Sequence, residues 1–213
     1  MKNLLVINSS SRILRSNSRS LTKAFVDHWS SIHTNSKIVS RELGNAAVPH
    51  ITDGWIGAAF KPEEARSEAD LQALEISNEY IAELQEADVI VIGTPMYNWS
   101  IPSALKAYID QILRINVTWK IDPSNIQNPY VGLLKNKTLY LMLSRGAQGY
   151  EKGEYNAHMN FQNDYLKTVF NVMGIYDIHV VAINGESFDP GKFEQSIKDS
   201  HQKVKELIEL QLV

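Results

Sequence analysis

Two loops of the amino-acid sequence concentrate side chains that suit ligand binding. The first, "NSSSRILRSNSRS" at residues 8–20, holds six serines, three arginines and Asn17. Hydroxyl and amide groups are short hydrogen-bond donors, and the free backbone N–H groups at the start of a following helix would add to them. The loop therefore predicts a phosphate site. The simpler alternative is that Ser16 or Ser18 only caps the helix.

The second loop, "TPMYNW" at residues 94–99, follows a run of aliphatic residues. Met96, Tyr97, Asn98 and Trp99 combine polarisable, flat and hydrogen-bonding groups, which suit a flat ring such as a flavin. The alternative is a corner whose aromatic side chains pack in the core. A third loop, "SRGAQGYEKG" at residues 144–153, offers glycines that allow close backbone approach, although such glycines are also typical of plain turns.

Missing motifs narrow the chemistry. The sequence has no GxxxxGK[ST] and no GxGxxG, so a single phosphate, as in FMN, is favoured over bound ATP or a dinucleotide. The chain has no cysteine, so electrons would have to be carried by a bound cofactor. The six histidines show no metal-binding spacing, and no metal site is expected.

Overall composition is that of a globular protein. The 213 residues fit one domain, 1–213, and the net charge of -3 gives no general attraction to nucleic acid or to an anionic membrane. The first twelve residues contain only four consecutive aliphatics, too few for a signal-peptide core or a membrane span. We expect a cytoplasmic enzyme or binding protein.

Strands and helices alternate along the chain. Aliphatic runs predict strands at residues 4–7, 37–43, 88–93, 138–143 and 178–183, and apolar spacing predicts helices between and after them. Residues 44–66 are expected to form a long connecting insertion, and residues 116–136 an irregular insertion with turns. This alternation predicts an α/β fold, a flavodoxin-like doubly wound parallel sheet of order 2-1-3-4-5 with helices on both faces. Ligands then bind between strands 1 and 3, where the first two loops lie.

Helix signals are clear in two segments. Leu21, Phe25 and Trp29 recur at four-residue spacing and predict the buried stripe of the first helix. Ser67 with Asp70 three residues later forms a capping pattern for a helix over residues 67–86. On that helix one apolar side is expected to contain Leu71, Leu74, Ile81 and Leu84.

At these loops the chain resembles the FMN-dependent NADH azoreductases, also described as NADH:quinone oxidoreductases, of the flavodoxin-like superfamily. The matching pieces are "SSSRILRSNS", "PMYNW" and "SRG". The resemblance implies an FMN phosphate and ribityl site, a loop against the isoalloxazine and a second loop at the ring edge. The corresponding residues are Ser10, Ser16, Asn17 and Ser18, then Met96, Tyr97, Asn98 and Trp99, then Ser144, Arg145, Gly146 and Ala147.

The resemblance also implies a homodimer with the flavin sites at its interface. Such enzymes use NADH or NADPH to reduce quinones and azo compounds by ping-pong two-electron transfer, with no strictly catalytic side chain. Trp55, Phe60 and Phe161 are candidate substrate-stacking residues, and Tyr150 a candidate wall or helper; their alternative is core or dimer packing. A flavodoxin-type electron carrier without substrate turnover remains the alternative function.

The sequence departs from the family pattern in the third loop. Ala147 stands where a second glycine is usual, and its methyl group would narrow the approach to the ring. Gln148, Gly149 and Tyr150 follow where some relatives have a histidine, so no proton-donor role is assigned there.

Overall fold

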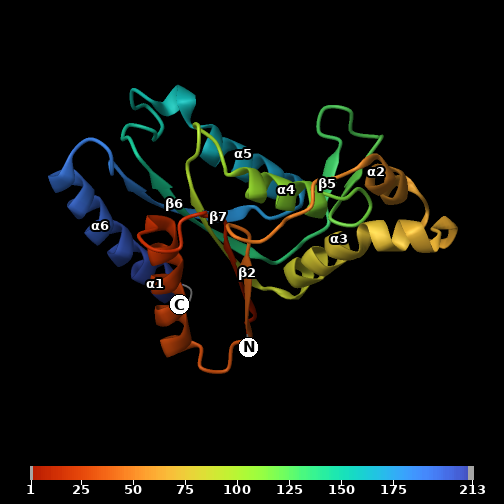
Figure 1. The fold of residues 1–213 in the computed structure, drawn as a ribbon, viewed down its shortest axis with the longest axis horizontal. Helices are drawn as coiled ribbons and strands as arrows, with labels where there is room; N and C mark the ends of the chain where they lie inside the picture. The colour runs from red at the N-terminus through yellow and green to blue at the C-terminus, as the bar shows by residue number, and fades with distance from the viewer. Residues whose placement is uncertain (1, 211–213) are drawn as a thin grey trace.

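The computed structural model of the protein describes residues 2–210 and is built around a five-stranded parallel sheet. The strand order is β2-β1-β3-β6-β7 (Figure 1). The strands are β1 (Leu4–Asn8), β2 (Ile38–Glu42), β3 (Val89–Pro95), β6 (Thr138–Arg145) and β7 (Asp177–Asn184). Because β6 and β7 are the fourth and fifth strands of this sheet in chain order, the predicted flavodoxin-like order is confirmed.

Helices cover both faces of the sheet (Figure 1). One face carries α1 (Asn17–Ile32) and α6 (Pro190–Glu209). The other carries α3 (Glu68–Glu86), α4 (Ser103–Ile112) and α5 (Phe161–Val172). Among the helices that the structure describes, none is long and apolar enough to cross a membrane.

Strand alternation divides the core between these two layers. In β1, Leu4 and Val6 pack with the apolar stripe of α1, whereas Leu5 and Ile7 pack with α3, α4 and α5. All four side chains are buried, as expected for a parallel strand covered on both faces. The stripe predicted on the first helix, Leu21, Phe25 and Trp29, is fully buried.

Both expected insertions contain secondary structure, so the prediction of irregular chain over residues 116–136 was wrong. Residues 44–66 include α2 (Asp53–Phe60) and the short 3-10 helix η1 (Glu63–Ala65). Residues 116–136 include a hairpin of β4 (Trp119–Ile121) and β5 (Tyr130–Gly132). A second 3-10 helix, η2 (Ala157–Met159), precedes α5. The glycines at 54 and 57 lower the helix propensity of α2, so the sequence alone gives only a weak helix signal there.

The α2 helix owes its stability to a cap and to tertiary packing. Thr52 accepts a hydrogen bond from the backbone N–H of Trp55 at 3.2 Å. The side chain of Trp55 packs with Ala58 of the same helix and with Leu74 of α3. The capping box predicted for α3 is present, with Ser67 and Asp70 bonded reciprocally. Leu71, by contrast, is 51% exposed and lies off the buried side formed by Leu74, Ile81 and Leu84.

We predict that Leu141→Ala in β6 lowers the free energy of unfolding by about 2–5 kcal/mol, because it leaves a cavity in the core beside an interior strand. Ile126→Ala, at a side chain that is almost wholly exposed, should change it by less than about 0.5 kcal/mol. Urea unfolding of both variants tests this; similar losses at the two positions would contradict the assignment of the core.

Candidate functional site

The carboxyl ends of three neighbouring strands bring the sequence-predicted loops together. Asn8 at the end of β1 is in register with Gly93 of β3, and Pro95 at the end of β3 is in register with Ser144 of β6. The loops that follow these strands line a cavity of about 240 Å³, together with the loop after β7. Its lining residues are Ser10, Arg12, Arg15, Ser16, Asn17, Pro95, Met96, Tyr97, Ser144, Arg145, Gly146, Glu186 and Ser187.

The serine loop enters α1 through a helix cap. Ser16 is the N-cap residue and accepts a hydrogen bond from the backbone N–H of Arg19 at 3.4 Å. The capping alternative is therefore confirmed for Ser16, but the same residue also lines the cavity. The backbone N–H groups in the first turn of a helix have no acceptor within the helix. The start of α1 therefore presents hydrogen-bond donors and a partial positive charge to the cavity.

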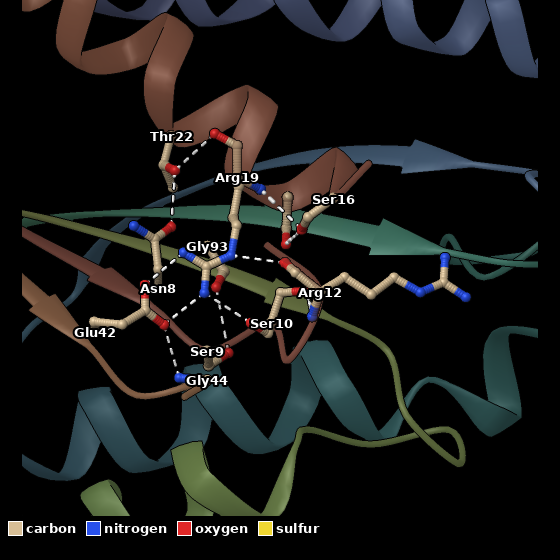
Figure 2. A network of polar contacts seen from close by, with 11 residues as sticks. Asn8, Ser9, Ser10, Arg12, Ser16, Arg19, Thr22, Glu42, Gly44 and Gly93 are labelled. Atoms are coloured by element: carbon tan, nitrogen blue, oxygen red, sulfur yellow. Dashed lines mark hydrogen bonds and ion pairs between the residues drawn. The ribbon is translucent and has the colours of Figure 1, made fainter. Parts of the chain in front are cut away.

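A polar network holds this loop against the end of β2 (Figure 2). The guanidinium of Arg19 donates to both carboxylate oxygens of Glu42, each at 2.5 Å. It also donates to the backbone oxygens of Ser10, at 2.7 Å, and Arg12, at 2.9 Å. Figure 2 shows the guanidinium of Arg12 pointing away from this network. Arg19 therefore braces the loop from behind, while Arg12 lines the cavity.

Glu42 is held as a carboxylate by the same network. Partial burial raises the pKa of its carboxyl, but hydrogen bonds from Arg19 and from the backbone N–H of Gly44 outweigh burial and leave the pKa below its ordinary value. Gly44 has no room for a side chain, since a Cβ there would lie 2.0 Å from the backbone oxygen of Ser10. The chain after β2 thus packs directly on the serine loop.

The loop after β3 contains a tight two-residue turn. Tyr97 and Ser100 exchange backbone hydrogen bonds of 3.1 and 3.0 Å, and the two residues between them, Asn98 and Trp99, have φ of 49° and 63°. Positive φ at both central positions matches a type I′ turn. The backbone N–H of Met96 donates to the oxygen of Ser144 at 2.7 Å, which ties this loop to the end of β6.

The loop after β6 begins at Arg145, whose side chain is completely buried. Its Nε donates to Gln162 Oε1 at 3.1 Å and its Nη1 to Glu151 Oε1 at 2.8 Å. Among the described residues, its buried Nη2 finds no hydrogen-bond partner. Gly146 lies beneath Ser187, whose Oγ would be 2.9 Å from a Cβ at that position.

Eight of the twelve sequence-predicted cofactor residues line the cavity. The other four, Ser18, Asn98, Trp99 and Ala147, do not. Ser18 is buried, with its Oγ 3.3 Å from that of Ser16, and the backbone oxygen of Ala147 accepts a bond from Gly185 at 3.2 Å. Asn98 and Trp99 are exposed at the turn beside the cavity.

None of the four candidate substrate residues lines this cavity. Trp55 is buried in the core, where its indole N–H donates to Gln111 Oε1 at 2.8 Å, so it offers no open ring face. Tyr150 is also buried, with the guanidinium of Arg145 at 5.6 Å from its ring centre. Phe60 and Phe161 are 70% and 61% exposed.

Sequence reasoning missed the contribution of the fifth strand. Glu186 and Ser187, in the loop between β7 and α6, line the cavity, and Glu186 Oε1 lies 3.4 Å from Arg12 Nη1. The available signal was topological, because all strands of a parallel sheet end at the same edge. Arg12 and Arg15 were recognisable as cations near the phosphate loop, and Pro95 as the end of β3.

Three comparisons relate the chain to known proteins. A family described as having a flavodoxin-like fold matches residues 2–208. An FMN-dependent NADH:quinone oxidoreductase from Nostoc punctiforme is 39% identical over 209 residues, 98% of each chain. The FMN-dependent NAD(P)H:quinone oxidoreductase 1 of Pseudomonas aeruginosa is 36% identical, covering 96% of this chain and 97% of that protein. A crystal structure of an azoreductase from Bacillus anthracis strain Sterne matches with a TM-score of 0.87 at 25% identity, covering 98% of this chain and 99% of that one.

We predict that Glu42→Gln flattens the acid limb of the stability curve. Because the folded-state pKa of Glu42 lies below the unfolded value, its carboxylate stabilises the native state above the ordinary pKa. This contribution is lost as the pH falls from the ordinary carboxyl pKa through the lower folded-state pKa. Urea unfolding across that range should show a smaller loss of stability in the variant than in the unmodified protein. Parallel curves would mean that Arg19 does not stabilise the charged form.

Proposed function

Because the chain belongs to the flavodoxin-like family of FMN-dependent NADH:quinone oxidoreductases, we propose that it binds FMN and uses NADH or NADPH to reduce quinones and azo compounds. The observation that carries the proposal is the convergence of three loops, after β1, β3 and β6, on one cavity. These are the loops whose composition predicts a phosphate site and a flat-ring site.

The phosphate of FMN would bind at the start of α1. Ser10, Ser16 and Asn17 supply short polar side chains there, and the first turn of the helix supplies backbone donors. The cavity lining contains three arginines against one carboxylate, Glu186, so its balance of charge favours an anion. Arg12 and Arg15 are the arginines of this loop that line the cavity, and we assign them to the phosphate.

The ring of FMN would lie between the other two loops. Met96 and Tyr97 present backbone groups and apolar surface, while Ser144 and Gly146 form the opposite side. The buried Nη2 of Arg145, without a partner among the described residues, is a donor that a ring carbonyl or nitrogen would satisfy. Phosphate donors at one end and an unsatisfied donor at the other make the cavity chemically suited to FMN.

The chain's own contribution is to bind, orient and shield. FMN, when bound, supplies the two-electron chemistry, for which a chain without cysteine has no redox side chain of its own. The Tyr97–Ser100 turn fixes the backbone that faces the ring, and the bond between Met96 and Ser144 fixes the spacing of the two ring loops. We assign no side chain to a catalytic role.

We further propose that the active form is a homodimer with the flavin sites at its interface. Phe60 and Phe161 are large apolar side chains left exposed, as is half of Trp99, and exposed apolar surface of this kind favours association. In a dimer these rings would wall the substrate space, whereas Tyr150 would act as a buried support. A cytoplasmic location would give the enzyme access to reduced nicotinamide nucleotides.

The direct test is spectroscopic. The purified protein, alone or after addition of FMN, should show flavin absorbance, and anaerobic NADH should bleach it. Steady-state NADH consumption with a quinone then distinguishes an enzyme from an electron carrier, which would give almost none. A protein that stays colourless with added FMN would overturn the proposed function.

We predict that Asn98→Gly weakens FMN binding by about two- to tenfold, since a polar group at the ring edge loses its partner. Glycine keeps the positive φ of this position accessible, so backbone strain is not added. Asn136→Gly is the matched control, because Asn136 also has positive φ, 58°, but precedes β6 at the opposite edge of the sheet. Fluorescence titration with FMN compares the two variants. Equal FMN affinity in Asn98→Gly and Asn136→Gly would show that Asn98 does not contribute to FMN binding.

A further inference from the structure

Arg145 is a buried cation at the end of β6, an interior strand of the sheet. Its side chain is 0% exposed, and a charged group taken out of water must be compensated by partners. Two of those partners are present: neutral Gln162, held in turn by a 3.3 Å bond from its Nε2 to the backbone oxygen of Thr94, and the carboxylate of Glu151. Nη2 has none among residues 2–210.

The two ends of this ion pair face different spaces. Arg145 lines the cavity assigned to FMN, whereas Glu151 does not. Glu151 is 55% exposed and lines a separate open groove of about 650 Å³, formed with β7 and α6. Water therefore screens the carboxylate more than the guanidinium, so the buried guanidinium is the less screened charge of the pair.

The remaining charges of the cavity do not cancel it. Glu186 is the one carboxylate in the lining, and it lies 3.4 Å from Arg12, which comes from the loop at the phosphate end. Arg15 adds a further cation. The ring end of the cavity therefore lies beside a buried guanidinium, and the carboxylate paired with it at 2.8 Å is the more exposed of the two charges.

We propose that Arg145 raises the reduction potential of the bound cofactor and so favours its reduction by NADH or NADPH. The inference rests on the proposed function. Transfer of a hydride oxidises the nicotinamide and adds two electrons and one proton to the ring, which gains one unit of negative charge. A fixed cation in a water-poor site stabilises that charge by Coulomb attraction. Arg145 therefore acts on the cofactor through the charge of its guanidinium, without being a catalytic residue.

The test measures the midpoint potential of FMN bound to the full-length protein, by anaerobic equilibration with reference dyes. Arg145→Gln removes the cation and should lower the potential. Glu151→Gln removes the counter-charge and should raise it. Arg145→Lys keeps the charge and should lie closer to the unmodified protein than Arg145→Gln does. Asp27→Asn, which removes a carboxylate from the exposed ion pair with Lys23, is the matched control and should leave the potential unchanged.

The expected size is a change of at least about tenfold in the affinity ratio of reduced to oxidised FMN, or about 30 mV for a two-electron couple. Shifts of the midpoint potential in opposite directions for Arg145→Gln and Glu151→Gln would support the inference. A pair with a purely structural role would shift the potential in the same direction whichever partner is removed. Shifts of the same sign, or none, overturn the inference. If Arg145→Gln does not fold, as judged by circular dichroism, absence of a positive shift in Glu151→Gln overturns it alone. Failure of the unmodified protein to bind FMN would instead contradict the proposed function.

Discussion

The parallel register of β1, β3 and β6 is the constraint on which the rest of the site depends. Because these strands run in one direction, each ends at the same edge, and the change of direction between β1 and β3 leaves a crevice there. The loops that follow these strands must then be held in place at the rim of the crevice. Gly44 and Arg19 meet this need from behind, one by allowing close backbone packing on Ser10 and the other by bonding to the loop backbone.

Charge is distributed around the cavity in a consistent way. Arg19 is paired with Glu42 and does not line the cavity, so its role is to hold the loop. Arg145 is buried at the other end, where its acid partner lies in a different groove. The lining of the cavity holds three arginines against one carboxylate, a balance of charge that favours an anion. Burying a guanidinium lowers stability unless its donors are satisfied, and among the described residues Nη2 of Arg145 has no partner.

Much of this arrangement was predictable from the sequence because its physical causes are local. Alternation of aliphatic runs with helical spacing predicts the sheet order, and the composition of two loops predicts most of the cavity lining. What could not be predicted depends on distant contacts. The α2 helix forms because Trp55 packs on α3, despite weak local propensity, and Leu71 is exposed although its spacing matches a buried stripe. Glu186 reaches the cavity only because β7 ends beside β6.

Backbone strain is concentrated at the same edge of the sheet. Within residues 2–210, five residues other than glycine have positive φ, and three of them, Arg15, Asn98 and Trp99, lie in or beside the cavity. Each such residue costs on the order of 1 kcal/mol or more, and a tryptophan in this region is unusual. The turn persists because β3, with Pro95 as its last residue, and α4, capped at Pro102, fix both ends of the segment. A loop held in this way is already arranged without a ligand, so less ordering entropy would be lost when a ligand binds beside it.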